Sequence, residues 1–121
     1  VCYDPFRLAL SAGAIAREGR PGEAMGLLRQ AIELAPNDVS VRFQLALLAR
    51  DQNDIATARE QLHQCTALAP DFADGWYHLS VLQHSVGERA SAERTLAEGL
   101  RRGPQSPGLH LLNAQRLRDA N

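Results

Sequence analysis

The sequence predicts an all-α protein in which helix–turn–helix repeats follow one another along the chain. Three prolines, Pro36, Pro70 and Pro104, stand 34 residues apart, and each separates one apolar helical pattern from the next. A fixed period of this length is typical of stacked-repeat architectures. No segment shows the sustained alternation of apolar and polar residues that would indicate a strand. We therefore expect seven helices and no sheet.

The first two helices are expected at residues 5–18 and 22–34. Pro5 suits the first turn of a helix, because its missing N–H would have no partner there. Pro36 ends the second helix, since its ring disfavours the helical conformation in the residue before it. Asp38 then offers a side chain that can cap the next helix. One helix pair with a sharp turn after it thus forms the first repeat.

The same pattern recurs twice more and is followed by a single helix. The remaining helices are expected at residues 39–52, 55–68, 73–86, 89–102 and 107–119. In the turn within each pair, the first and third repeats have Gly19 and Gly87, and the second has Asn53 in the same place. The three repeats are therefore in phase.

Small residues recur at fixed positions when the repeats are numbered from Pro5, Val39 and Ala73. They are Ala12, Ala46 and Ser80 at position 8, Ala24, Ala58 and Ala92 at position 20, and Ala31, Cys65 and Gly99 at position 27. Proline stands at position 32 in each repeat. This pattern resembles the tetratricopeptide repeat, a helix–turn–helix of about 34 residues. Only the third repeat has the family's Trp at position 4 (Trp76), where the second has Arg42.

The resemblance implies a right-handed α-solenoid of three tetratricopeptide units and a C-terminal capping helix. Its parts are expected at residues 1–4 (an N-terminal leader), 5–38, 39–72 and 73–106 (the three units) and 107–121 (the capping helix). Small side chains at positions 8 and 20 would let the two helices of a unit approach to about 8–10 Å, and position 27 would do the same for the next unit's first helix.

The two ends of the array can be read from the helix faces that meet neighbouring units. In this fold, positions 3, 7 and 10 of a first helix contact the preceding unit. In the first unit they are Arg7, Ser11 and Ala14, a polar face that needs no cover, so the array is expected to begin at residue 5. In the last helix, Leu109 and Leu112 are expected to cover the third unit.

Composition excludes several classes of function. Thirteen basic and fourteen acidic residues leave no net field that favours nucleic acid or an anionic membrane. Cys2 and Cys65 are too few for a disulfide framework, no apolar run approaches the roughly 20 residues that span a bilayer, and no signal peptide is present.

Every basic residue is Arg, which suggests a bacterial, GC-rich genome, so the cytoplasm is the expected location and the periplasm the alternative. Because the chain begins at Val1, we expect it to be part of a longer protein.

Residues with catalytic or metal-binding chemistry do not occur in the patterns that such sites need. The histidines, at positions 63, 78, 84 and 110, form no metal-ligand motif. No serine stands in a nucleophile motif, no glycine run forms a phosphate loop, and Cys65 is expected to be a buried, inert thiol. Arg94, Glu98 and Arg102 are spaced for ion pairs on a solvated outer face. We therefore expect no enzyme, no metal and no cofactor.

The resemblance also indicates which residues could bind a partner. In tetratricopeptide arrays the first helices line the inner groove through positions 2, 5, 6, 9, 12 and 13. The apolar residues expected there are Phe43, Leu47, Tyr77, Val81 and Leu111, and the polar residues beside them are Gln44, Arg50, His78 and His84. An exposed apolar patch with a polar rim commonly marks a binding site. The alternative is that some of these side chains only pack between neighbouring first helices.

One subfamily grips the C-terminal carboxylate of chaperones with Lys, Asn and Arg at five of these positions. The residues found there in this chain are Ala9, Gly13, Gln44, Asp74 and His78. That clamp is absent, and Asp74 would repel a carboxylate.

We therefore expect a scaffold or adaptor module that binds a protein or peptide in its concave groove, with neither nucleic acid nor membrane as a partner. The alternative is a structural or dimerising appendage of a larger parent protein, which could itself be an enzyme. A monomer is expected, with a homodimer as the alternative.

Overall fold

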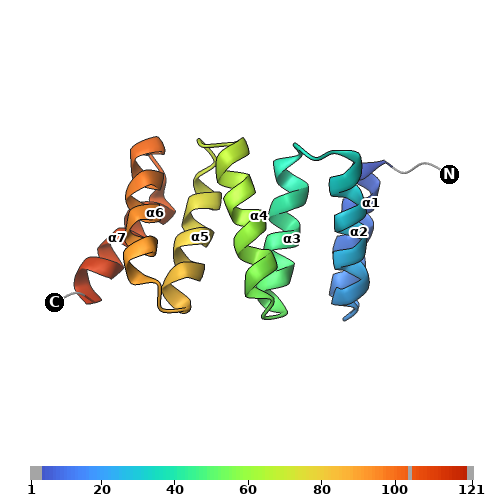
Figure 1. Cartoon of the computed structure of the whole chain (residues 1–121), viewed down its shortest axis with the longest axis horizontal. Helices are drawn as coiled ribbons and strands as arrows, with labels where there is room; N and C mark the ends of the chain where they lie inside the picture. The colour runs from blue at the N-terminus through green and yellow to red at the C-terminus, as the bar shows by residue number, and fades with distance from the viewer. Residues whose placement is uncertain (1–3, 104, 120–121) are drawn as a thin grey trace. The chain divides into compact units, whose positions relative to one another are not determined.

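The computed structural model describes residues 4–103 and 105–119, and over these residues it contains seven helices and no strand. The helices are α1 (Pro5–Arg17), α2 (Pro21–Leu34), α3 (Val39–Asp51), α4 (Ile55–Leu68), α5 (Ala73–Ser85), α6 (Arg89–Arg102) and α7 (Pro107–Asp119), as Figure 1 shows. The predicted all-α fold is confirmed, and each helix begins and ends within one residue of its expected range. Pro104, the third of the repeated prolines, lies outside the described residues. Cys2 and most of the predicted leader do so as well.

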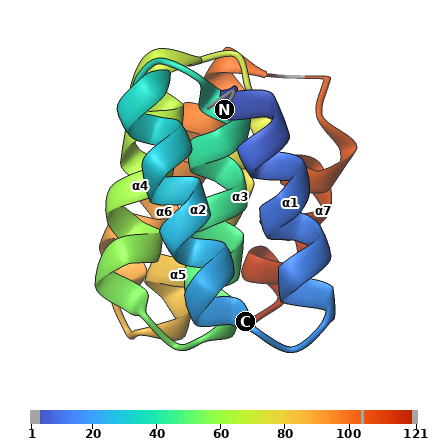
Figure 2. The same ribbon diagram turned by 90° about the vertical axis from the view of Figure 1, so that its right-hand side faces the viewer.

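The helices form two compact units, Val1–Gln64 and Cys65–Asn121. In the N-terminal unit, α1 lies against α2, and α3 packs on both of them (Figure 2). The small residues predicted at positions 8 and 20 lie in its core. Ala12, Ala24, Ala46 and Ala58 are all buried, so the close approach of paired helices that the pattern predicted is present in this unit.

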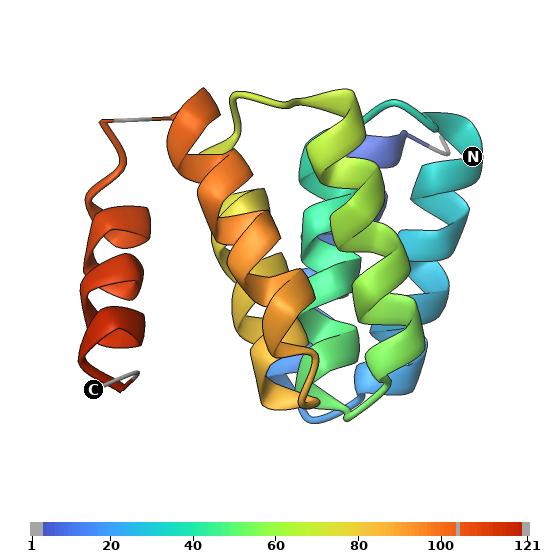
Figure 3. The ribbon, with the colours of Figure 1, turned by 60° about the vertical axis from the view of Figure 1, so that its left-hand side comes forward.

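In the C-terminal unit, α5 lies against α6, and α7 packs on both (Figure 3). Ser80 replaces alanine at position 8, and its hydroxyl donates a hydrogen bond of 2.9 Å to the backbone carbonyl of Ala92 at position 20. The buried hydroxyl thereby has a hydrogen-bond partner on the facing helix. The cluster of Leu96, Leu109 and Leu112 forms the core between α6 and α7, which confirms that the last helix covers the third repeat through these leucines.

The turn within each helix pair depends on one residue in the left-handed conformation. Gly19 (φ 84°), Asn53 (φ 62°) and Gly87 (φ 88°) occupy this position. In the second repeat the next amide, that of Asp54, donates 2.8 Å to the carbonyl of Ala49 and closes the end of α3. Glycine and asparagine are the residues that adopt this conformation at least cost, which explains the one exception to glycine in the sequence.

Replacing Gly87 with Ala is expected to lower the free energy of unfolding by about 1–2 kcal/mol, because a Cβ disfavours the left-handed conformation. Asn53→Gly is the matched change at the equivalent turn, and it should leave stability the same or slightly higher. Urea denaturation of the two variants measures both effects. If Gly87→Ala unfolds at the wild-type midpoint, the positive φ does not constrain this turn.

Arg42 and Trp76, which occupy position 4 in the second and third repeats, make the same hydrogen bond. The Arg42 Nε donates to the carbonyl of Pro36 at 2.8 Å, and the Trp76 indole Nε1 donates to the carbonyl of Pro70 at 2.8 Å. Each bond ties the start of a first helix to the proline that ended the previous helix. Arg42 therefore substitutes for Trp as a donor, although the sequence comparison marks it as a departure from the family.

Trp76→Phe keeps an aromatic side chain, although a smaller one, but removes the indole N–H, so we expect a loss of at least about 1 kcal/mol in the free energy of unfolding. Arg42 also donates to the Gln61 side chain at 2.9 Å. Arg42→Met, which removes both of its bonds, should therefore cost at least as much as Trp76→Phe. Thermal melts of the two variants test this order. Two variants as stable as the wild type would show that the proline carbonyls need no donor from position 4.

Candidate functional site

The residues predicted to line a groove lie on first helices and on the last helix. In the N-terminal unit, α3 carries Phe43, Gln44, Leu47 and Arg50, all of them half-buried. In the C-terminal unit, α5 carries Tyr77, His78, Val81 and His84, all of them half-buried, and Leu111 on α7 is exposed. The structure thus distributes them over both units.

The N-terminal unit carries a depression of about 190 Å³ between α1, α2 and α3, hereafter the α1–α3 depression. Its lining is Ala12, Gly13, Ala16, Leu28, Gln44, Leu47, Leu48 and Asp51. The floor is aliphatic, and the polar groups are the Gln44 amide and the Asp51 carboxylate. Two of the predicted residues, Gln44 and Leu47, are therefore brought together here. A mostly apolar hollow with a few polar groups is the usual form of a small binding site.

Gly13 makes the α1–α3 depression accessible. A Cβ on this glycine would meet only the Arg17 guanidinium at 3.6 Å, so space lies above the backbone of α1 at this point. Phe43 and Arg50 do not line the depression; Arg50 forms an exposed ion pair of 3.3 Å with its neighbour Asp51. Nearer the N-terminus of α1, Phe6 and Leu10 are exposed at 67% and 59%.

Two of the predicted residues on α5 have a packing role. Tyr77 and Val81 are partly buried against the cluster of Leu96, Leu109 and Leu112. The Tyr77 ring also meets the His78 ring edge to face, with 5.1 Å between centroids. The alternative considered from the sequence, that some inner-face side chains pack between neighbouring first helices, therefore describes Tyr77 and Val81 in this unit.

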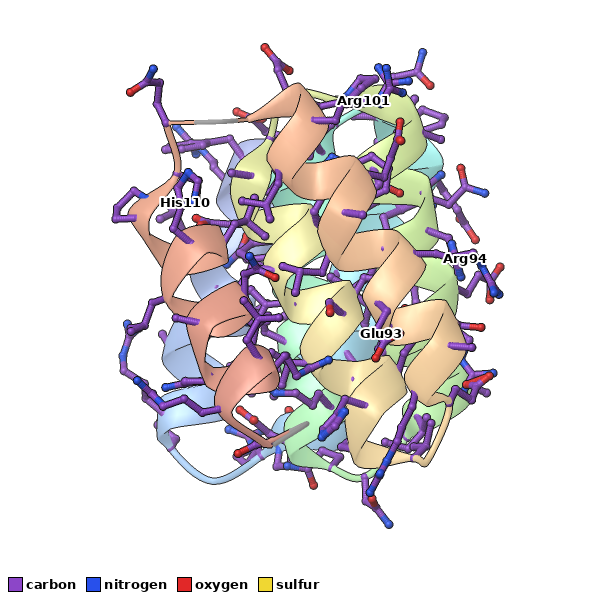
Figure 4. The ribbon with its side chains drawn as sticks, turned by 90° about the vertical axis from the view of Figure 1, so that its left-hand side faces the viewer. Glu93, Arg94, Arg101 and His110 are labelled. Carbon is purple, nitrogen blue, oxygen red and sulfur yellow. The ribbon has the colours of Figure 1, made fainter. Side chains whose placement is uncertain are left out.

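The outer face of α6 is charged and exposed. Glu98 accepts hydrogen bonds from Arg101 and from Arg102, the latter at 2.7 Å, and these bonds lower the pKa of its carboxyl group to about 2. Arg94 does not pair with Glu98 as the spacing suggested; it donates to the Ser91 hydroxyl at 3.1 Å. In Figure 4, Arg94 and Glu93 leave α6 on different sides, with Glu93 on the side nearer α7. Exposed pairs of this kind contribute little to stability.

Sequence reasoning missed several residues that the structure gathers. Ala12, Ala16 and Asp51 join the α1–α3 depression, and Arg116 with Asp119 lines a second hollow in the C-terminal unit. Arg116 could have been found, because it occupies position 10 of the last helix, where an apolar residue would pack on the preceding repeat. Ala16 and Asp51 could also have been found, because they occupy the groove-lining positions 12 and 13 of their repeats, whereas Ala12 occupies the core position 8.

Among residues 4–103 and 105–119, no group of three or more His, Cys, Asp or Glu side chains could hold a metal ion. Within that part of the chain, no helix combines the length and the apolar character needed to cross a bilayer. Cys65 is fully buried, as its small-residue position predicted.

A family model described as Tetratricopeptide repeat matches residues 16–64 and 49–116. Tetratricopeptide repeat protein 33 of Xenopus laevis is 30% identical over 94 residues, which make up 78% of this chain and 36% of the frog protein. The chain thus spans about a third of the length of this relative.

Solved structures with the same fold cover nearly the whole chain. YrrB, a TPR protein with an unusual peptide-binding site, superposes with a TM-score of 0.80 at 22% identity, over 93% of this chain and 57% of that one. The first TPR of Spaghetti (RPAP3), bound to an HSP90 peptide, has a TM-score of 0.82 at 12% identity, over 97% and 92%. At these identities the likeness establishes the fold.

Proposed function

Because this chain belongs to the tetratricopeptide repeat family, we propose that it is a protein-interaction module that holds a peptide segment of a partner against the inner side of its first helices. Proteins of this family are in general interaction modules. The observation that carries the proposal is the α1–α3 depression, an aliphatic hollow open to solvent beside Gln44.

The size and lining of the α1–α3 depression suit one apolar anchor of the partner. A hollow of about 190 Å³ has room for a single large aliphatic or aromatic side chain. Leu28, Leu47 and Leu48 offer it apolar contact, and apolar anchors buried in pockets usually supply most of the affinity of an interface. Leucine, isoleucine or phenylalanine is therefore the expected anchor residue.

The polar groups at the same depression suit the backbone of a peptide. The Gln44 amide can both donate and accept hydrogen bonds, which an extended peptide backbone requires. Asp51 adds one negative charge, although its ion pair with Arg50 partly offsets that charge. We infer that the ligand has an apolar anchor and little net charge, unlike a peptide that relies on a terminal carboxylate.

The remaining predicted groove residues stay part of the proposal as contacts beyond the depression. Phe43 and Arg50 flank it on α3. In the C-terminal unit, Leu111 is exposed at 59%, and His78 and His84 are half-buried polar residues of α5. These side chains would add specificity, whereas Tyr77 and Val81 would act mainly by supporting the helices on which the others stand.

A matched pair of glycine substitutions tests the proposal. Peptides are first selected from a random phage-displayed library on the wild-type protein, and their affinity is measured by fluorescence anisotropy. Gly13→Leu should weaken binding at least about tenfold, since losing one apolar anchor costs more than about 1.4 kcal/mol. Gly26→Leu, on the exposed side of α2 where a Cβ meets nothing within 4 Å, should leave affinity unchanged.

Two results would count against this function. Selected peptides that bind Gly13→Leu as well as the wild type would place the site away from the α1–α3 depression. A concentration-dependent dimer in light scattering, which Gly13→Leu abolishes, would instead support the dimerising appendage, because a second copy would then occupy the depression.

A further inference from the structure

A second hollow, of about 280 Å³, lies within the C-terminal unit between α5, α6 and α7. Its lining is His84 from α5, Arg89 and Glu93 from α6, and Arg116 and Asp119 from α7. Figure 4 shows Glu93 on the side of α6 that is nearer α7. His84 is one of the residues predicted to face the partner, so this charged pocket opens beside the inner side of α5.

The charges around this pocket balance but do not pair. Two guanidinium groups, of Arg89 and Arg116, face two carboxylates, of Glu93 and Asp119. In the part of the chain that the structure describes, no ion pair within 4.0 Å joins any of these four groups to another. The pocket therefore keeps both donors and acceptors available to a guest and has no net charge of its own when His84 is neutral.

Arg116 has an unmet requirement for a hydrogen-bond acceptor. Its Nη2 donates to the backbone carbonyl of Ser80 at 3.4 Å, but its Nη1 is buried and has no acceptor among the described residues. Burial lowers the pKa of this guanidinium, although the charges of Asp119 and Glu93 oppose that shift. A buried donor without an acceptor destabilises the folded state.

Packing does not explain why α7 has an arginine at residue 116, because the unsatisfied donor destabilises the folded state. Leu112 and Leu109 occupy the same side of α7, one and two turns before Arg116, and both are buried against α6. A leucine at position 116 would extend that apolar stripe and leave no unsatisfied donor. Residues that break the local pattern at a cost in stability concentrate at functional sites.

We propose that this pocket receives a carboxamide side chain, that of Gln or Asn, from the partner segment. The carboxamide oxygen accepts the hydrogen bond that Arg116 Nη1 lacks, and the carboxamide NH₂ donates to Glu93 or Asp119. An acidic side chain would meet the two carboxylates, and a basic one would meet the two guanidinium groups. The inference rests on the proposed function, because a partner must lie along α5 to reach the pocket.

Capped amino acids test the pocket without any partner. The ¹H–¹⁵N signal of the Arg116 side-chain Nε is followed by NMR while N-acetyl-glutamine methylamide, or its glutamate, arginine or leucine counterpart, is added. We expect a saturable shift with the glutamine probe, and apparent affinities at least about tenfold weaker for the other three, equivalent to 1.4 kcal/mol of discrimination. Equal or larger responses to glutamate, or no response to glutamine at its solubility limit, would overturn the proposal.

Arg116→Leu separates a binding role from a structural one. It should raise the melting temperature by about 2–4 °C, because it removes a half-buried guanidinium with an unsatisfied donor and adds apolar contact. On this variant the glutamine probe should no longer shift the backbone amides of His84 and Glu93. Arg118→Leu, an exposed change on the same helix, should leave the melting temperature and those shifts as in the wild type.

A fall in melting temperature on Arg116→Leu, or probe-induced shifts that survive in it, would assign Arg116 to structure alone. The Gly13→Leu comparison concerns the other unit, so failure of the carboxamide pocket would leave the proposed function standing. Conversely, loss of the proposed function would show in the peptide affinities and would not alter the response to capped glutamine.

Discussion

Replacing Leu109 with Ala is expected to lower the free energy of unfolding by about 2–5 kcal/mol, the cost of truncating a fully buried leucine and leaving a cavity. Leu109 has no exposed surface and packs with Leu96 and Leu112 in the core of the C-terminal unit. It is the main residue by which α7 covers α6. Urea denaturation followed by circular dichroism measures the loss. The urea transition should also broaden if the C-terminal unit unfolds before the N-terminal one.

Leu111→Ala provides the control for this change, because it truncates the same side chain two residues away at an exposed position of α7. Its effect should stay within about 0.5 kcal/mol. Should the two alanine variants prove equally stable, α7 would not cover the third repeat in solution, and the core described for the C-terminal unit would be wrong.

Gly99→Ala is expected to destabilise the protein by about 1–3 kcal/mol through overpacking. A Cβ on Gly99 would lie 2.6 Å from the Trp76 Cβ and 3.3 Å from the Leu109 Cδ1. The Trp76 Cβ is fixed by the backbone of α5, so α5 and α6 would have to move apart. Helix propensity alone predicts the opposite sign, since alanine is favoured over glycine within a helix by about 1 kcal/mol.

Gly26→Ala isolates the propensity term, because nothing lies within 4 Å of a Cβ at that position of α2. It should raise the free energy of unfolding by up to about 1 kcal/mol. Thermal melts of the two alanine variants should therefore shift in opposite directions. A stabilised Gly99→Ala would mean that α5 and α6 are farther apart than the structure places them.

The fold could be predicted closely because its constraints repeat along the chain. The prolines, the left-handed turn residues and the small residues at positions 8 and 20 each recur at the same interval, so every repeat checks the others. Position 27 was predicted less completely: Gly99 was expected to make room for the next helix, and it does so for Leu109, but its nearest neighbour is Trp76 of its own repeat. Arg42 shows a further limit, because a hydrogen bond to a backbone carbonyl does not depend on one side-chain type.

The candidate site could be predicted only in part, since helix position gives the direction of a side chain but not its surroundings. Gln44 and Leu47 do line the α1–α3 depression. Tyr77, one of the apolar residues of the predicted groove, packs on the cluster around Leu109, so Tyr77→Ala would lower stability as well as any affinity. The charged pocket around Arg116 arises from three helices, and no single stretch of sequence contains it.

The most direct test of the central claim is to compare two double variants for binding of the selected peptides. Gly13→Leu/Leu47→Ala alters the α1–α3 depression, whereas Arg59→Gln/Arg94→Gln neutralises arginines on second helices. Binding through the inner side of the first helices predicts that the first variant loses at least about tenfold in affinity and the second retains it at moderate salt. Affinity that survives the first pair and collapses with the second would show that the partner binds the outer, charged helices.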